Sequence, residues 1–319
     1  MKRNVKLDNL KAFLIFIVVL GHVFEFMYGP SELYGFIRSI IYSFHMPAFI
    51  FLSGYFSKNS KTHLSKITVS YLSTYLIFNI VFSLTPWSIA PTLDLLRPQI
   101  ISWYLLCLLF WRVSVTALSK IKFIVPLSIL FTLYIGCIEP ADRFLSISRA
   151  ICFLPFFLAG YFCSMKKINN INLGLSWLLL AACLFLTGAA NYFKLLPVKM
   201  YEYIQCYHST DVGNLNGIQM RLFMIIISFV IIICLIRLSP TRRYWFTVFG
   251  ENSLMIYLIH IFPIEILNSY GILNFDNDCL NIAISVILSI ALCLVLSRPI
   301  ITTAYNYFNR FLVRIFTVS

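Results

Sequence analysis

Residues 10–28 read LKAFLIFIVVLGHVFEFMY, an apolar run interrupted only by the ionisable residues Lys11, His22 and Glu25. About 20 consecutive apolar residues cross the hydrocarbon core of a bilayer as an α-helix. The run follows a basic start, but it is too long for the apolar part of a signal peptide and no cleavage site of small residues follows it. The stretch therefore predicts a first transmembrane helix that stays in the protein.

Nine further apolar runs follow the first one. They cover residues 36–57, 65–84, 99–119, 123–138, 144–164, 171–193, 218–238, 249–269 and 279–307. Of the 319 residues, 60% are hydrophobic and 12% are charged, whereas soluble domains are about 25% charged. The mean hydropathy is +0.86. This composition excludes a water-soluble protein, and it predicts a single transmembrane domain over residues 1–319, an all-α bundle of about ten helices.

The basic residues indicate how the bundle is oriented. With the N-terminus in the cytoplasm, 15 Lys and Arg residues fall on the cytoplasmic side and 6 on the other, and every cytoplasmic loop is basic. Eight of the 12 acidic residues fall on the outer side. We therefore expect an even number of crossings, both termini in the cytoplasm and a bacterial cytoplasmic (inner) membrane. The net charge of +13 then needs no nucleic-acid partner.

The nine Cys residues form no CxxC pair and no spacing typical of a metal site. Seven of them lie in apolar runs, where Cys behaves as a small hydrophobic residue. Cys206 and Cys279 fall in loops on the outer side, where an oxidising compartment would allow them to pair. We expect no metal, and we leave the pairing open.

Ionisable residues inside a membrane are costly and are therefore candidates for function. Lys11 and His22 are eleven residues apart, so on a helix they share one face and lie about 16 Å apart along the axis. Glu25 follows His22 at i+3, close enough to orient the imidazole ring.

Two further His residues lie at a similar expected depth. His45 in run 36–57 is about as far from the cytoplasmic face as His22, so the two imidazoles could face each other. His260 lies at a similar level in run 249–269. A structural role as a hydrogen-bond donor between helices is the alternative for each His. Arg112 and Arg298 could equally extend to the interface or bond to helix carbonyls.

Several motifs resemble one family when taken in order along the chain. They are Asp8-Asn9-Leu10-Lys11 with Leu20-Gly21-His22, Phe44-His45-Met46-Pro47 with Leu52-Ser53-Gly54-Tyr55, Trp103-Tyr104-Leu105-Leu106 with Trp111-Arg112, Phe153-Leu154-Pro155-Phe156-Phe157-Leu158-Ala159-Gly160-Tyr161, and Gly250-Glu251-Asn252-Ser253-Leu254 with Tyr257-Leu258-Ile259-His260. The set resembles the membrane-bound acyltransferase-3 family, especially its fucose 4-O-acetylase-like branch. The resemblance covers nearly the whole chain.

The resemblance implies transfer of an acyl group, usually acetyl, from cytoplasmic acyl-CoA to a hydroxyl of a cell-surface or lipid-linked glycan. The family's Arg eleven residues before the catalytic His is Lys11 here, which keeps the charge but loses the planar fork. The family's Arg-x-x-Arg pair is replaced by His63-Leu64-Ser65-Lys66. We expect no permanently bound cofactor; acyl-CoA is a co-substrate.

The expected site has a catalytic part and a donor-binding part. His22 would act as general base on the hydroxyl or carry the acyl group itself, Glu25 would fix its tautomer, and His45 or Arg112 would stabilise the oxyanion. The CoA phosphates would bind among basic residues, namely Lys11, Lys58, Lys61, Lys66 and Arg112.

Two other functions remain open at this point. The bundle could be a transporter or flippase for a lipid-linked saccharide, with the His residues as a proton relay. It could also be a non-enzymatic partner in a glycan export complex. The sequence contains no repeated halves, which disfavours a transporter.

Overall fold

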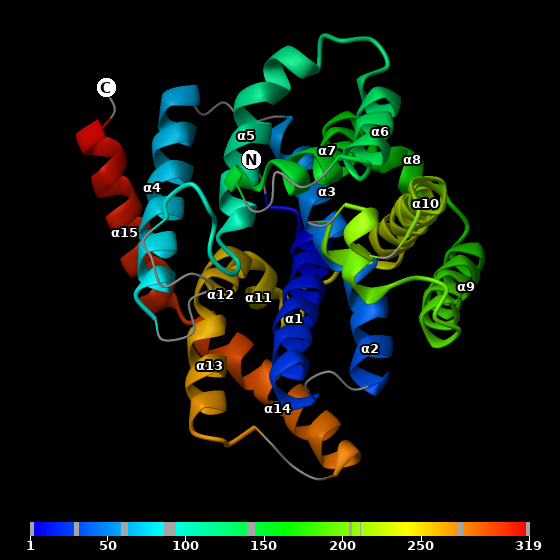
Figure 1. The fold of residues 1–319 in the computed structure, drawn as a ribbon. Helices are drawn as coiled ribbons and strands as arrows, with labels where there is room; N and C mark the ends of the chain where they lie inside the picture. The colour runs from blue at the N-terminus through cyan, green and yellow to red at the C-terminus, as the bar shows by residue number, and fades with distance from the viewer. Residues whose placement is uncertain are drawn as a thin grey trace. The chain divides into compact units, whose positions relative to one another are not determined.

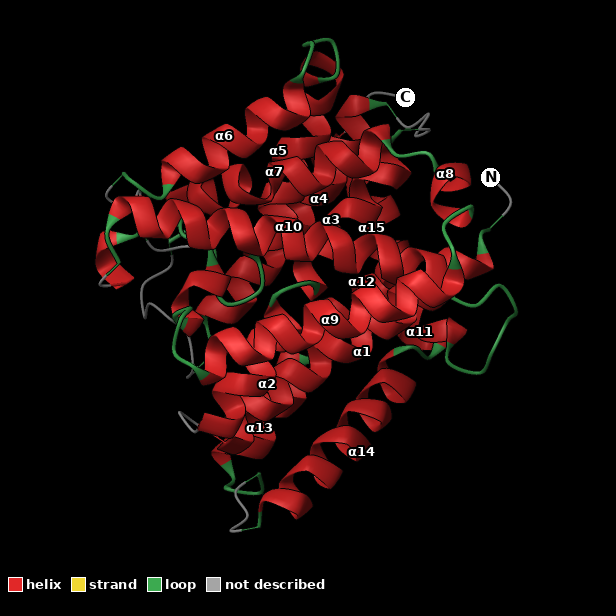
Figure 2. Ribbon diagram, turned by 90° about the vertical axis from the view of Figure 1, so that its right-hand side faces the viewer, coloured by secondary structure: helices red, strands yellow, loops and turns green. Residues whose placement is uncertain are grey.

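The structure is a computed structural model that describes residues 3–28, 32–58, 63–85, 94–138, 144–203, 206–210, 212–273 and 277–316. Every regular element in this part of the chain is a helix (Figure 2). In chain order the α-helices are α1 (Val5–Tyr28), α2 (Glu32–Tyr42), α3 (His45–Ser57), α4 (Leu64–Ser83), α5 (Trp103–Leu118), α6 (Ile124–Ile135), α7 (Ile147–Phe162), α8 (Met165–Asn169), α9 (Leu173–Tyr192), α10 (Asn214–Leu238), α11 (Thr247–Glu251), α12 (Ser253–Ile259), α13 (Ile261–Ser269), α14 (Asp278–Leu296) and α15 (Pro299–Phe316). Three 3₁₀ turns join them, η1 (Phe144–Ser146), η2 (Val198–Glu202) and η3 (His208–Thr210).

The helices match the apolar runs of the sequence. Within the described residues, seven segments are long and apolar enough to cross a membrane, and α5, α6 and the α12–α13 segment are shorter apolar helices. Together these segments fall on the ten predicted runs. The protein is therefore a polytopic all-α membrane bundle, as predicted.

The chain divides into two compact units. The first comprises Met1–Phe49, Ser164–Val198 and Ile227–Ala304, and the second comprises Ile50–Cys163, Lys199–Ile226 and Tyr305–Ser319. In the first unit α1 contacts α2, α11, α12, α13 and α14 (Figure 1). Its buried residues Leu7, Leu14, Ile15 and Val18 recur at helical spacing, which explains why α1 is the element around which the others pack.

The predicted run 36–57 is one candidate span but not one continuous helix. It consists of α2 and α3, separated by a turn at Ser43 and Phe44. Pro47 in the first turn of α3 has no backbone N–H, so it leaves the Ser43 carbonyl without a helical donor. The Ser228 hydroxyl of α10 donates a hydrogen bond to this carbonyl instead. The helix break is therefore stabilised by a hydrogen bond from another helix, and His45 is the first residue after the break.

The predicted run 249–269 is interrupted in the same way. It consists of α11, α12 and α13, and His260 lies between α12 and α13. Pro263 lies in the first turn of α13 and cannot donate to the Ile259 carbonyl. Both buried His residues thus lie where a proline interrupts a span.

The prediction of one helix over residues 279–307 is wrong. The structure has α14 and α15, which are separated at Ser297 and Arg298. Pro299 begins α15, since proline is tolerated at the first position of a helix but not in its interior. In α15 no residue is buried, and Tyr305 and Asn309 on this helix bond to Thr74 and Ser70 of α4 within the second unit.

Two short segments of the second unit have nearly the same sequence. Residues 51–56 read FLSGYF and residues 157–162 read FLAGYF. A Cβ atom on Gly54 would overlap the Phe157 carbonyl, and a Cβ atom on Gly160 would overlap the Phe51 carbonyl. The backbones of α3 and α7 therefore meet in a reciprocal contact that only glycine permits.

The cysteines do not form a disulfide within the described residues. All nine have free thiols, with Cys206 buried and Cys279 exposed. The pairing that the sequence left open is absent in this structure.

Candidate functional site

A pair of imidazole rings lies inside the first unit. The rings of His22 in α1 and His260 between α12 and α13 have centroids 5.2 Å apart and planes inclined by 42°. The Nδ1 atom of His22 is 3.3 Å from the Glu25 carboxylate, so the predicted i+3 contact is present. His22 is partly exposed, with 20% of its side chain accessible, whereas His260 is fully buried.

The hydrogen bonds of the two rings indicate which nitrogen is free. His22 Nδ1 faces a carboxylate, which can only accept, so Nδ1 carries a hydrogen, and in the neutral ring Nε2 is the nitrogen with the free lone pair. His260 Nδ1 lies 3.0 Å from the Ile256 carbonyl and 2.8 Å from the Tyr257 carbonyl, which gives it the same tautomer. His260 Nε2 is buried and has no hydrogen-bond partner among the described residues. In the neutral form of each ring, the acceptor nitrogen is therefore Nε2.

His45 is not the ring neighbour of His22 in the described part of the chain. Because the chain breaks before α3, His45 Nδ1 bonds back to the Ile41 carbonyl of α2 at 2.7 Å. Its ring packs edge-on against the Tyr42 ring, with centroids 4.8 Å apart, and the Arg38 guanidinium lies over the Tyr42 ring, 4.9 Å from its centroid. The expected His22–His45 pair is therefore a His22–His260 pair.

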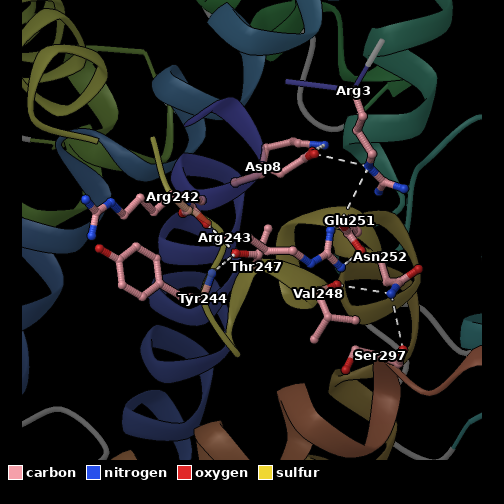
Figure 3. Close-up of polar contacts among 12 residues, drawn as sticks. Arg3, Asp8, Arg242, Arg243, Tyr244, Thr247, Val248, Glu251, Asn252 and Ser297 are labelled. Carbon is pink, nitrogen blue, oxygen red and sulfur yellow. Dashed lines mark hydrogen bonds and ion pairs between the residues drawn. The ribbon is translucent and has the colours of Figure 1, made fainter. Parts of the chain in front are cut away.

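A chain of five alternating charges begins at the N-terminal end of α1. Lys11 Nζ lies 2.8 Å from Asp8 Oδ1, and Arg3 Nε lies 3.1 Å from Asp8 Oδ2. Arg3 Nε also lies 3.7 Å from Glu251 Oε1, and Glu251 binds Arg243 through both carboxylate oxygens at 2.6 and 3.1 Å. Figure 3 shows Arg3 and Arg243 converging on Glu251. We call these five residues the inner charge chain.

The segment before α11 is held against α1 by side-chain hydrogen bonds. Asn9 Nδ2 donates to the carbonyls of Pro240 and Arg242, and the Thr247 hydroxyl donates to Asn9 Oδ1. A Cβ atom on Gly250 would overlap the Asp8 carbonyl, so glycine lets α11 approach α1 closely. This close approach brings Glu251 beside Arg3.

Asn252 completes the contacts of α11 by donating to the carbonyls of Val248 and Ser297 (Figure 3). Outside the membrane spans, the hydrogen bonds that Arg243 donates to the Glu251 carboxylate raise the pKa of Arg243, so its guanidinium stays charged. Asn252 thus anchors the end of α11, the helix that carries Glu251, the partner of Arg243.

The other predicted donor-binding residues belong to the second unit or fall outside the described residues. Lys58 follows α3 and Lys66 lies in the first turn of α4, and both are exposed. Arg112 is half-buried in α5. Lys61 lies outside the described residues. Of the five predicted cations, the structure places Lys11 on the same helix as His22.

Sequence reasoning did not identify the other four residues of the inner charge chain as neighbours of Lys11. Asp8 and Glu251 were visible only as parts of motifs, and Arg3 and Arg243 only as loop charges. The ion pair between Asp8 and Lys11 is local, because the two residues are three positions apart on α1. Glu251 is far from Arg3 in sequence, so no spacing rule links them.

The fold and the site define a class of protein: a helical membrane bundle with an imidazole pair inside its spans and fixed cations at the end of its first helix. Within the described residues no group of three or more His, Cys, Asp or Glu residues could hold a metal ion. The model of the acyltransferase-3 family, described as an acyltransferase domain, matches residues 4–298. The chain belongs to this family and is a membrane acyltransferase. Searches of curated proteins and of solved structures find no match.

Proposed function

We propose that the protein transfers an acyl group, in the first instance acetyl, from cytoplasmic acyl-CoA to a sugar hydroxyl of a cell-surface or lipid-linked glycan. The family supports acyl transfer. The single observation that carries the chemistry is His22, a partly accessible imidazole whose Nδ1 is bound to Glu25, so that in the neutral ring Nε2 is the basic nitrogen. The setting is a bacterial cytoplasmic membrane with both termini inside, which the basic loops support.

The proposed reaction uses His22 as general base. Its Nε2 takes the proton of the acceptor hydroxyl while the oxygen attacks the thioester carbonyl. The carbon–sulfur bond breaks, and the departing CoA sulfur receives the proton from His22. Glu25 stabilises the imidazolium that forms between these steps and holds the ring in one tautomer, as a carboxylate does for a catalytic His.

Replacing His22 by Ala tests this proposal. Loss of a general base lowers the rate by about 10²–10⁴-fold, so purified full-length protein should almost cease to move label from acetyl-CoA to glycan. His208→Ala is the matched control, because His208 is exposed in η3 and belongs to the second unit. Surface glycan from cells that carry only the His22→Ala protein should lose the mass of one acetyl group per modified sugar. Unchanged glycan at normal protein levels would contradict the proposal.

A further inference from the structure

We propose that the inner charge chain is the binding site for the phosphate groups of the CoA donor, with Arg3 and Arg243 making the contacts and Asp8 and Glu251 holding them in place. This inference rests on the proposed function, since it names where that donor binds. Arg3 and Arg243 are added here to Lys11 as donor-binding residues.

The two carboxylates are buried and the two guanidinium groups are not. The side chains of Asp8 and Glu251 are 5% and 12% exposed, whereas those of Arg3 and Arg243 are 56% and 60% exposed. Each carboxylate contacts two cations of the chain. The carboxylates therefore fix the cations from the protein side and leave their outer edges accessible.

The accessible edges are suited to phosphate. Arg3 uses only Nε toward Asp8 and Glu251, and its two terminal nitrogens make no hydrogen bond within the described residues. Arg243 turns both terminal nitrogens toward Glu251, but each keeps a second N–H. Guanidinium N–H groups bind phosphate oxygens in pairs. Three cations and two carboxylates also leave the inner charge chain with a net positive charge.

Stability alone is a poor explanation for this arrangement. Ion pairs with exposed partners contribute little to folding, and burying carboxylates is costly. The protein nevertheless places a glycine at position 250 so that α11 can bring Glu251 against the end of α1. Such close packing fits a role in fixing the positions of the cations.

The location also suits a donor whose acyl end reaches His22. Lys11 is part of the inner charge chain and shares α1 with His22. The two residues lie on one face of the helix, about 16 Å apart along the axis. A donor bound by its phosphates at Lys11, Arg3 and Arg243 would run its pantetheine arm along α1.

Arg242 provides a matched control. It is exposed, carries the same charge and is the sequence neighbour of Arg243, but its side chain makes no hydrogen bond or ion pair within the described part of the chain. In Figure 3 the Arg242 side chain points away from Glu251, whereas that of Arg243 points toward it. Arg242→Gln therefore removes one unit of charge without touching the inner charge chain.

The test is the binding of labelled CoA to full-length protein in lipid nanodiscs. Arg3→Gln and Arg243→Gln should each weaken binding by about tenfold, the value of one charge-assisted hydrogen bond. Arg242→Gln should leave the dissociation constant within about twofold of wild type, because exposed charges act weakly. Equal effects of Arg242→Gln and Arg243→Gln would overturn the inference.

The Glu251→Gln variant distinguishes attraction by total charge from binding by cations held in fixed positions, because the two predict opposite changes in CoA affinity. If the cations merely attract CoA by their total charge, removing a carboxylate strengthens binding. If Glu251 holds Arg243 and Arg3 in place, the same change weakens binding, which is the result we expect. Stronger binding would overturn the inference. Arg243→Lys, which keeps the charge and loses the fork, should also weaken binding.

Two controls separate the failure of this inference from that of the proposed function. Elution as a single species on size exclusion shows which variants fold, and Arg3→Gln and Arg243→Gln alter exposed side chains. Wild-type protein that binds CoA through these residues but moves no acyl group would overturn the proposed function and leave the site intact. If wild-type protein transfers the acyl group and Arg243→Gln has the same KM for acetyl-CoA as wild type, the proposed phosphate site is overturned and the proposed function stands.

Discussion

His260 shows how hydrogen bonds to the backbone can fix one nitrogen of a buried imidazole and leave the other without a partner. Its Nδ1 binds two carbonyls at the end of α12, and this leaves Nε2 buried without a partner among the described residues. A buried acceptor without a donor costs free energy, and such groups concentrate at functional sites. The His260 ring lies beside the His22 ring, with centroids 5.2 Å apart, so this cost falls on a neighbour of the proposed general base.

At the residue scale, the contact between α3 and α7 gives a testable prediction. Gly160→Ala places a methyl group against the Phe51 carbonyl, which is backbone and cannot turn aside. We expect a loss of about 1–3 kcal/mol of stability from overpacking. Gly213→Ala is the matched control, because no atom lies within 4 Å of its added Cβ. Thermal unfolding in detergent measures both, and equal midpoints for the two variants would contradict the close contact.

Residues close in sequence were predicted better than residues far apart. The His22–Glu25 contact and the shared face of Lys11 and His22 follow from the geometry of a helix. The His22–His260 and Arg3–Glu251 contacts depend on how separate helices pack, and the sequence carries no periodic signal for that. A family motif marked Glu251 and His260, but it did not say what they touch.

At the element scale, the hydropathy of the sequence does not mark where a span is interrupted. Run 36–57 stays apolar through Ser43 and Phe44, and run 279–307 stays apolar enough through Ser297 and Arg298. Lipid tolerates an interrupted helix only where the freed backbone groups find partners. In α2–α3 that partner is Ser228, which comes from α10 and is therefore absent from any local reading of the run.

The partner of the α2–α3 break can be removed. Ser228→Ala leaves the Ser43 carbonyl without its donor, and a buried unsatisfied acceptor costs about 1–3 kcal/mol. Ser269→Ala is the control, because its exposed hydroxyl bonds only to the Ile266 carbonyl of its own helix. We expect a lower unfolding midpoint for Ser228→Ala than for Ser269→Ala. A shift of the same size in both would show that the Ser43 carbonyl does not depend on Ser228.

At the scale of the whole molecule, the sequence predicted the number of apolar segments correctly but not all of their ends. The seven candidate spans and three shorter apolar helices coincide with the predicted runs. The proposed orientation rests on the distribution of charge, which is a property of the complete chain and needs no knowledge of packing. For that reason the sequence alone allows a prediction of the orientation, whereas it allows none of the partners that individual side chains have on other helices.

The proposed orientation can be measured with a native residue. Cys279 is exposed in the first turn of α14, at the end of this helix that the charge distribution assigns to the outer side. A thiol reagent that cannot cross membranes should label it in intact spheroplasts, and Cys279→Ser should remove the label. A tag fused after the last residue should be reached by protease only in inside-out vesicles, because an even number of crossings puts it in the cytoplasm. Digestion of the tag in intact spheroplasts would require an odd number.

The contact between residues 51–56 and 157–162 has a consequence for how the gene can change. Each glycine faces a backbone carbonyl of the other segment, so no side-chain change on the partner helix makes room for a larger residue. The two sites cannot compensate for each other, and a pair of substitutions is at least as harmful as either alone. The two glycines are thus expected to persist together through divergence, while position 53 and its counterpart 159 already differ, with Ser53 bonded to the Tyr104 hydroxyl and Ala at 159.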